Sequence, residues 1–142
     1  MEKTHALLTP LFEDSGTEMT PASVDAIALF AERARARSVP EGAIRELSRF
    51  YRVTNGVPCL DGFEFHECGD DILYEWWDDE RSLWLGSRDD DVLRWSDGKF
   101  RLGDAGNIRF DENHEFGTLT ELLEFAFGEW YPDGADDQKE EN

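Results

Sequence analysis

Cysteine and long apolar runs are both scarce in this sequence. Cys59 and Cys68, its only cysteines, stand nine residues apart. This spacing fits neither a C-x-x-C redox pair nor a zinc knuckle, and two thiols are too few for a disulfide-stapled secreted domain. No run approaches the roughly 18 apolar residues of a membrane helix. The first apolar stretch is broken by Thr9 and Pro10, unlike a signal peptide. We therefore expect a cytoplasmic protein with reduced thiols.

Positive charge is scarce as well. The chain carries 14 Lys and Arg against 33 Asp and Glu, for a formal net charge of −19. Residues 53–142 hold 25 acidic and seven basic side chains, so nearly all of the excess lies there. Such a field repels nucleic acid and anionic membranes and speeds the encounter with basic molecules. We therefore expect a basic protein partner, and neither nucleic acid nor a membrane.

Recognisable catalytic and ligand-binding motifs are also missing. The glycines form neither G-x-G-x-x-G nor a P-loop, and no serine has the context of a nucleophile elbow. The acidic runs at 78–80 and 89–91 lack the ligand spacing of an EF-hand. His114 stands among acids at 111–115, where a cation site and a charged loop are the alternatives. The sequence predicts no catalytic residue, metal or cofactor, although a hydrolase using scattered carboxylates stays open.

Large hydrophobic side chains, in contrast, are plentiful. Hydrophobic residues make up 39% of the chain and aromatic residues 13%, with five Trp and ten Phe. Disordered chains carry far fewer. The length of 142 residues suits one ordinary domain. The sequence therefore predicts a single domain over residues 20–131, after an N-terminal extension at 1–19 and before an acidic flexible tail at 132–142.

Two helices are predicted in the first half of the chain. Thr20 and Pro21 have the pattern of an N-cap and a first-turn proline, and apolar residues then recur at helical spacing to about Arg37. A second helix is predicted over 41–53, with an apolar stripe made of Ile44, Leu47, Phe50 and Tyr51. The Asn-Gly pair that follows ends this helix, with Gly56 expected at the left-handed C′ position.

Strands are predicted after this point. Beyond a short loop, Phe63 and Phe65 alternate with Glu64 and His66, which predicts a half-buried strand with His66 exposed. The segment "SLWLGS" is apolar enough for a central strand, and "GNIRF" repeats the alternation further on. The segment 72–77 fits either a short helix or an irregular loop.

The dipeptide Asp-Gly at 97–98 is a preferred two-residue hairpin turn. It pairs Trp95 with Phe100 on one face and Arg94 with Arg101 on the other. Since opposed arginines repel, we expect a carboxylate or solvent between them.

A final helix is predicted from Thr118, which forms a Thr-x-x-Glu capping box with Glu121. Its apolar stripe contains Leu119, Leu122, Leu123, Ala126, Phe127 and Trp130. Helices, then a run of strands, then a closing helix is an α+β order, with N-terminal helices and a C-terminal helix packed on one face of a mainly antiparallel sheet.

The segment 69–91 interleaves acids with large aromatic residues. It holds nine acidic and two basic residues around three tryptophans. Aromatic anchors ringed by charge are typical of a protein-binding hot spot. Alternatively, the tryptophans belong to the core and the acids only keep the protein soluble. The candidate partner-binding residues are Trp76, Trp77, Asp78, Asp79, Glu80, Asp89, Asp90 and Asp91.

Several segments together resemble a known family. The run "IRELSRFYRVTNGVPCLDGFEFHE", followed by "LWLGSRDDDVLRW", "GNIRF" and "TLTELLEFAF", is similar to the SUKH (Smi/Knr-like) superfamily over roughly residues 22–130. The resemblance implies a non-enzymatic α+β domain, because the family contains bacterial immunity proteins and fungal cell-wall-synthesis regulators. The shared features are a helix that ends in Asn-Gly, a strand directly after it, and a strand that ends at Gly86. None of them is a catalytic motif.

The resemblance implies a cytoplasmic immunity protein, an antitoxin that binds a polymorphic toxin. Nuclease toxins are typically basic, which agrees with the charge of −19. The alternative is a regulatory or scaffold protein in cell-wall or envelope synthesis. No family motif covers the segment "ILYEWW", so binding residues do not transfer one by one.

Overall fold

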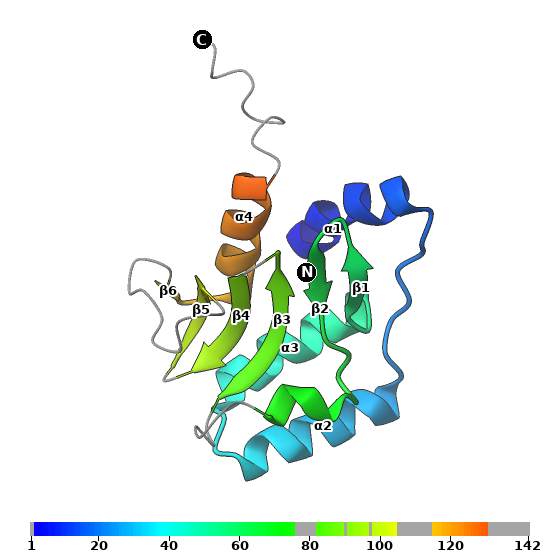
Figure 1. The fold of residues 1–142 in the computed structure, drawn as a ribbon. Helices are drawn as coiled ribbons and strands as arrows, with labels where there is room; N and C mark the ends of the chain where they lie inside the picture. The colour runs from blue at the N-terminus through cyan, green and yellow to red at the C-terminus, as the bar shows by residue number, and fades with distance from the viewer. Residues whose placement is uncertain (1, 76–81, 90, 97, 105–114, 131–142) are drawn as a thin grey trace.

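The computed structural model describes residues 2–75, 82–89, 91–96, 98–104 and 115–130 (Figure 1). Within these ranges the chain forms four α-helices, one 3-10 helix and six strands. In chain order they are α1 (Glu2–Ser15), α2 (Val24–Ala36), α3 (Glu41–Val53), β1 (Val57–Leu60), β2 (Phe63–Phe65), the 3-10 helix η1 (Asp71–Tyr74), β3 (Leu83–Arg88), β4 (Asp91–Ser96), β5 (Lys99–Asp104), β6 (Glu115–Phe116) and α4 (Leu119–Trp130).

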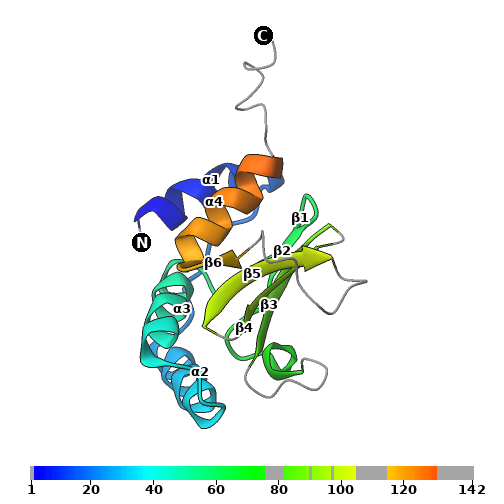
Figure 2. The ribbon, with the colours of Figure 1, turned by 90° about the vertical axis from the view of Figure 1, so that its left-hand side faces the viewer.

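The strands form one antiparallel sheet in the order β1-β2-β3-β4-β5-β6. All four helices lie on one face of it, and η1 lies at the end of the sheet, beside β3 and α2 (Figure 2). The predicted α+β class is therefore confirmed. We call the face of the sheet that points away from the helices the outer face; it is toward the viewer in Figure 1.

Helix α1 was not predicted, because the sequence analysis treated residues 1–19 as an extension. Thr4, Leu8 and Leu11 recur at helical spacing and are all buried, and α1 contacts α4, α3 and β1. An ion pair of 2.7 Å between Lys3 and Glu124 also joins α1 to α4. Pro10 lies inside the helix. Because proline usually ends or kinks a helix, its presence argued against predicting one here.

Helix α2 begins later than predicted. Its N-cap is Ser23, whose hydroxyl accepts a hydrogen bond of 3.1 Å from the Ala26 N–H. Thr20 instead offers its carbonyl to the Asn55 N–H at 2.7 Å, outside the helix. The prediction of Thr20 as N-cap was therefore wrong: Thr20 and Asn55 join the chain before α2 to the end of α3.

Helix α3 has the predicted bounds, and its predicted stripe is buried. Thr54 is its C-cap, so the C′ position falls at Asn55, and Gly56, which was predicted at C′, lies one residue beyond it. Gly56 has φ +82°, and an added Cβ would stand 2.6 Å from the Phe65 carbonyl oxygen. Glycine is therefore needed here both for its backbone conformation and for the close approach of β2.

The end of α3 is fastened to β2 by polar and aromatic contacts. The Tyr51 hydroxyl donates a hydrogen bond of 2.8 Å to the His66 carbonyl, and the Asn55 side chain accepts one of 3.0 Å from the Cys68 N–H. The rings of Phe50 and Phe65 lie 4.1 Å apart. The short loop expected before β2 is in fact strand β1, which pairs with β2.

The predicted hairpin is confirmed. Trp95 pairs with Phe100 and Arg94 with Arg101. Arg101 forms an ion pair with Glu115 of β6, which supplies the expected carboxylate, and Arg94 donates to the Ser96 hydroxyl at 3.0 Å. The segment "GNIRF" lies outside the described residues.

The predicted capping box of α4 is also confirmed. The Glu121 N–H donates to the Thr118 hydroxyl at 3.2 Å, and the Thr118 N–H donates back to the Glu121 carboxylate at 3.3 Å. Glu46 of α3 accepts a further bond of 2.8 Å from the Leu119 N–H, which joins α3 to α4. The helix buries Leu119, Leu122, Leu123, Ala126 and Phe127.

The substitution Gly86→Ala tests the packing of β2 on β3. Its Cβ would collide with the Glu64 carbonyl and stand 2.8 Å from the Phe65 Cα. Because both obstacles are main chain, we expect the free energy of unfolding, measured in urea, to fall by about 3 kcal/mol. In the control Gly42→Ala, on α3, the Cβ meets nothing within 4 Å, and the free energy of unfolding should rise by about 0.5 kcal/mol. A loss at Gly86 of under about 0.5 kcal/mol would contradict this close approach.

Candidate functional site

Two of the eight predicted partner-binding residues lie within the described chain. Asp89 is exposed in the β3–β4 turn with φ +53°, and its N–H donates to the Gly62 carbonyl at 2.7 Å. Asp91 forms an ion pair of 2.7 Å with Arg88. The other predicted residues, namely Trp76, Trp77, Asp78, Asp79, Glu80 and Asp90, lie outside the described residues.

The two predicted acidic runs are attached to opposite ends of one strand. Asp89 follows β3, whereas the segment 76–81 rejoins the described chain at Ser82, just before β3. Six residues of strand span about 20 Å. Of the predicted residues, the structure therefore brings Asp89 and Asp91 into one turn and attaches the 76–80 run at the other end of β3.

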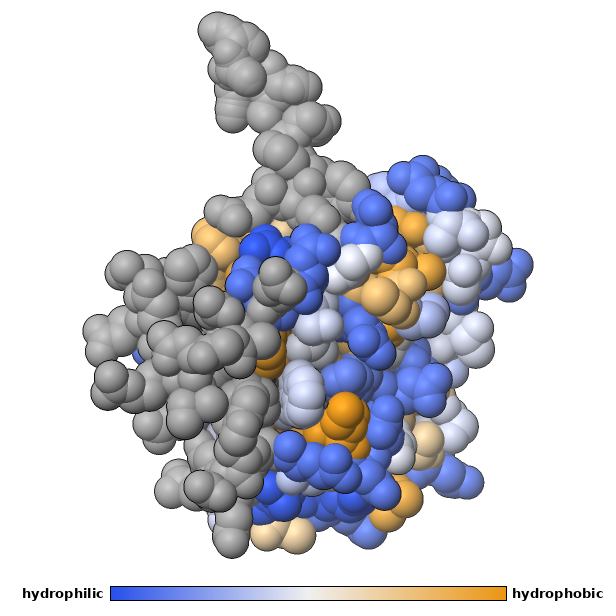
Figure 3. Space-filling model, viewed as in Figure 1, coloured by the Kyte–Doolittle hydropathy of each residue, from blue (hydrophilic) through white to orange (hydrophobic). Residues whose placement is uncertain are grey.

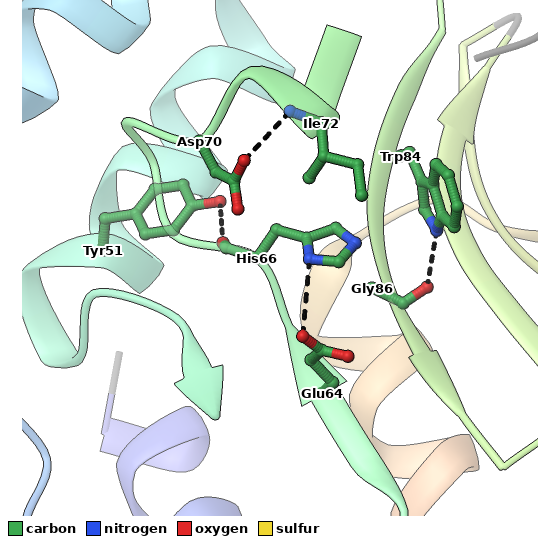
Figure 4. A network of polar contacts seen from close by, with 7 residues as sticks. All are labelled: Tyr51, Glu64, His66, Asp70, Ile72, Trp84 and Gly86. Carbon is green, nitrogen blue, oxygen red and sulfur yellow. Dashed lines mark hydrogen bonds and ion pairs between the residues drawn. The ribbon is translucent and has the colours of Figure 1, made fainter. Parts of the chain in front are cut away.

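A polar and aromatic cluster lies on the outer face beside η1, as Figure 4 shows. Glu64 and His66 come from β2 and the residue after it, and Trp84 comes from β3. The alternation of each strand points them away from the helices. The His66 and Trp84 rings meet edge to face at 5.6 Å, and the Trp84 indole donates to the Gly86 carbonyl at 3.2 Å.

His66 is buried, with 8% of its surface exposed, so the prediction of an exposed histidine was wrong. The strand ends at Phe65, and the chain turns through residues 67–70 toward η1. The His66 N–H donates to the Leu85 carbonyl at 2.7 Å. Burial lowers the pKa of His66, while the nearby Glu64 and Asp70 carboxylates oppose this shift. Nδ1 of His66 lies 3.9 Å from the Glu64 carboxylate, and Nε2 has no hydrogen-bond partner within the described chain.

Glu64 and Asp70 lie close to His66 in this cluster, and further acidic residues follow along η1. Asp70, Asp71 and Glu75 are exposed and Glu64 is half-buried. We call these four residues, together with Trp84, the acidic face. Asp70 caps η1 through a bond of 3.1 Å from the Ile72 N–H. Figure 3 shows that hydrophilic residues dominate the described part of this side of the molecule.

η1 is held against α2 by a cation–π contact. The Arg33 guanidinium lies 4.2 Å from the centre of the Tyr74 ring and forms an ion pair of 2.9 Å with Asp71. Burial raises the pKa of Tyr74 to about 12. The acidic face therefore rests on a fixed turn, and one of its four carboxylates is paired with a cation.

The side chains of this cluster are able to make polar and apolar contacts with another molecule. Glu64 and Asp70 accept hydrogen bonds and attract cations, and Trp84 supplies a large flat apolar surface. Among the residues that the structure describes, no three His, Cys, Asp or Glu side chains lie together as a metal site would require. No helix in the described ranges is long and apolar enough to span a membrane.

Comparison with known proteins finds no matching family model, no matching curated protein and no matching solved structure.

Glu64 and His66 were not predicted as site residues, whereas Trp84 belongs to the acidic and aromatic segment at 69–91. Strand alternation puts Glu64 and His66 on one face, and that signal was available. The pairing of β2 with β3, which brings Trp84 beside His66, comes only from the fold.

His66 should make the stability of the fold depend on pH. In the unfolded chain histidine titrates near 6.5, and burial lowers its pKa in the folded protein. Below about pH 6.5 the unfolded state therefore binds more protons than the folded state, so the free energy of unfolding falls as the pH falls. Urea titrations at pH values between about 7.5 and 5.5 should show a smaller fall in His66→Gln than in the unsubstituted protein.

The matched control is His5→Gln, at an exposed position of α1. It should keep the pH dependence of the unsubstituted chain. If stability falls equally in His66→Gln and in the unsubstituted protein, His66 is not the source of the pH dependence.

Proposed function

We propose that this chain is a non-enzymatic binding protein whose acidic face covers a basic surface of a protein partner. The observation that carries this proposal is the grouping of Glu64 and Asp70 near His66, whose ring meets the half-buried Trp84 edge to face at 5.6 Å. The exposed Glu75 follows η1 in the same stretch of chain. An apolar anchor inside a ring of one charge combines contact area with long-range attraction. The net charge of −19 gives the whole molecule the same sign.

The location of the charge supports the proposal. Glu75 is followed in the chain by the predicted run 76–80, so the acidic face and that run belong to one continuous stretch of sequence. The face is built on β2, β3 and η1, which are tied to α2 and α3 by Arg33 and Tyr51. A surface held in place before binding loses little conformational entropy on association.

The biological setting that we propose is immunity. The resemblance to the SUKH superfamily suggests an antitoxin that neutralises a basic, nuclease-type toxin, with regulation of cell-wall or envelope synthesis as the alternative. A toxin gene directly beside the gene for this chain would favour immunity, whereas an isolated gene would favour regulation.

The test starts by capturing the partner on the tagged full-length chain and identifying it by mass spectrometry. We expect a basic protein. Its association with the triple variant Glu64→Gln, Asp70→Asn, Glu75→Gln is then measured by stopped flow at several salt concentrations. Because steering depends on local charge, association at low salt should be about 3–10-fold slower than for the unsubstituted chain, with a weaker dependence on salt.

The matched control removes the same charge elsewhere. Glu13, Asp14 and Glu18 are exposed on or just after α1, and their replacement by Gln, Asn and Gln changes the net charge equally. This variant should associate nearly as fast as the unsubstituted chain. If both triple variants slow association equally, the effect comes from the net charge of the chain and not from the acidic face. If the first triple variant does not slow association, the acidic face is not the binding site.

A further inference from the structure

A groove runs between α2 and α3 on the helical side of the molecule, and it is separate from the acidic face. Its volume is about 480 Å³. In Figure 2, α2 and α3 form the lower part of the helical layer, and α1 and α4 form the upper part. Residues of α2 at helical spacing line one side, and residues of α3 at helical spacing line the other.

The lining of the groove is mainly apolar, and part of it is open to solvent. Ile27 and Ile44 form its deep part, and Ala28 and Ala31 keep it shallow because their side chains are small. Val24 lies at one end with 82% of its surface exposed. Large apolar side chains this exposed are uncommon on the described surface, where Val24 and Leu29, both on α2, are the two found.

Positive charge borders the groove. Arg35, Arg45 and Arg52 line it, with Glu41 as the acid among the lining residues. Arg35 is engaged by Glu41 in an ion pair that closes the end of the groove at the α2–α3 turn. Arg45 and Arg52 are exposed. Arg35, through its hydrogen bond, and to a smaller extent the nearby Arg45 lower the pKa of Glu41. Arg49 continues the same row on α3, at the i, i+4, i+7 spacing that places the three arginines on one helix face.

A row of exposed arginines beside an apolar groove is unusual in so acidic a chain. A protein with 33 acids and 14 bases would be expected to pair most of its exposed arginines with nearby carboxylates. Arg33, Arg35, Arg88 and Arg101 have carboxylate partners, and of these four only Arg35 is exposed. Arg45, Arg49 and Arg52 instead leave a basic row beside an apolar groove, which favours a partner that is apolar on one side and acidic at its edge.

From these observations we infer that the α2–α3 groove is a docking site for an acidic amphipathic segment of a partner protein. The apolar side chains of that segment would pack on Val24, Ile27 and Ala31, and its carboxylates would meet Arg45 and Arg52. A helix fits, because α2 has 13 residues and two shallow, parallel ridges of side chains accept a third helix between them. This site differs in charge and position from the acidic face and does not depend on the function proposed for it.

The probe is a synthetic, fluorescently labelled helical peptide of about 14 residues, a length that spans about 20 Å. It carries leucines at i, i+3, i+4 and i+7 and glutamates on the flanks of that stripe. The comparison peptide has the same leucines with lysine in place of each glutamate. Binding to the full-length chain is followed by fluorescence anisotropy at low and high salt, and the site is mapped by amide chemical shifts.

We expect the acidic peptide to bind and the basic comparison peptide to leave the α2 and α3 amides unshifted. The double substitution Arg45→Glu, Arg52→Glu should weaken binding about tenfold or more. Ala28→Trp, which fills the groove from an exposed position, should weaken it as well. Lys99→Glu changes the charge at an exposed position of β5 and should have little effect. Circular dichroism confirms that each variant is folded.

Three outcomes would overturn the inference. The first is the absence of binding by the acidic peptide, or binding that neither groove variant weakens. The second is a dimer in light scattering that Arg45→Glu, Arg52→Glu separates, which would assign the groove to a second copy of the chain. The third is peptide binding that occurs only after residues 131–142 are deleted, which would assign the groove to the chain's own acidic segment.

Discussion

The structure depends on the contact between Tyr51, at the end of α3, and the turn that follows β2. The buried ring packs edge to face on Phe30 and Phe50, and its hydroxyl donates to the His66 carbonyl at 2.8 Å. Its own carbonyl accepts a bond of 2.9 Å from the Ala22 N–H, at one end of the α2–α3 groove. One residue thus links the helical layer to the sheet, and burial raises its pKa well above the usual value, which keeps the hydroxyl a donor.

The contact of Tyr51 with the turn after β2 connects the two elements that carry surfaces of opposite charge, the sheet with the acidic face and α3 with its row of arginines. The acidic face lies on the outer side of β2, β3 and η1, whereas the row of Arg45, Arg49 and Arg52 lies on α3 in the helical layer. In a chain with a net charge of −19, this separation of charge would let the two proposed surfaces bind different partners, because like charges disfavour the wrong contact. Both surfaces consist of side chains suited to contact and orientation, with the fold supplying their positions.

The sequence predicts much of the fold because local signals agree with the tertiary structure. The bounds of α3, the register of the hairpin and the capping box at Thr118 were all correct, since each rests on spacing within a few residues. The misses have a common cause. Helix α1 contains Pro10, His66 follows the last residue of its strand, and Thr20 has a tertiary partner in Asn55. In each case contacts distant in sequence outweighed the local pattern. The candidate site was found in part: strand pairing, which the sequence does not state, brings His66 beside Trp84 and Glu64 opposite Ser87.

The central claim is that the chain acts as a preformed binding surface, with its acidic face turned toward a basic partner. Hydrogen–deuterium exchange on the complex with the captured partner tests it most directly. The account predicts slower exchange in β2, in η1 and at the start of β3, with exchange in α1 unchanged. Protection confined to α1, or spread evenly over the molecule, would contradict the claim.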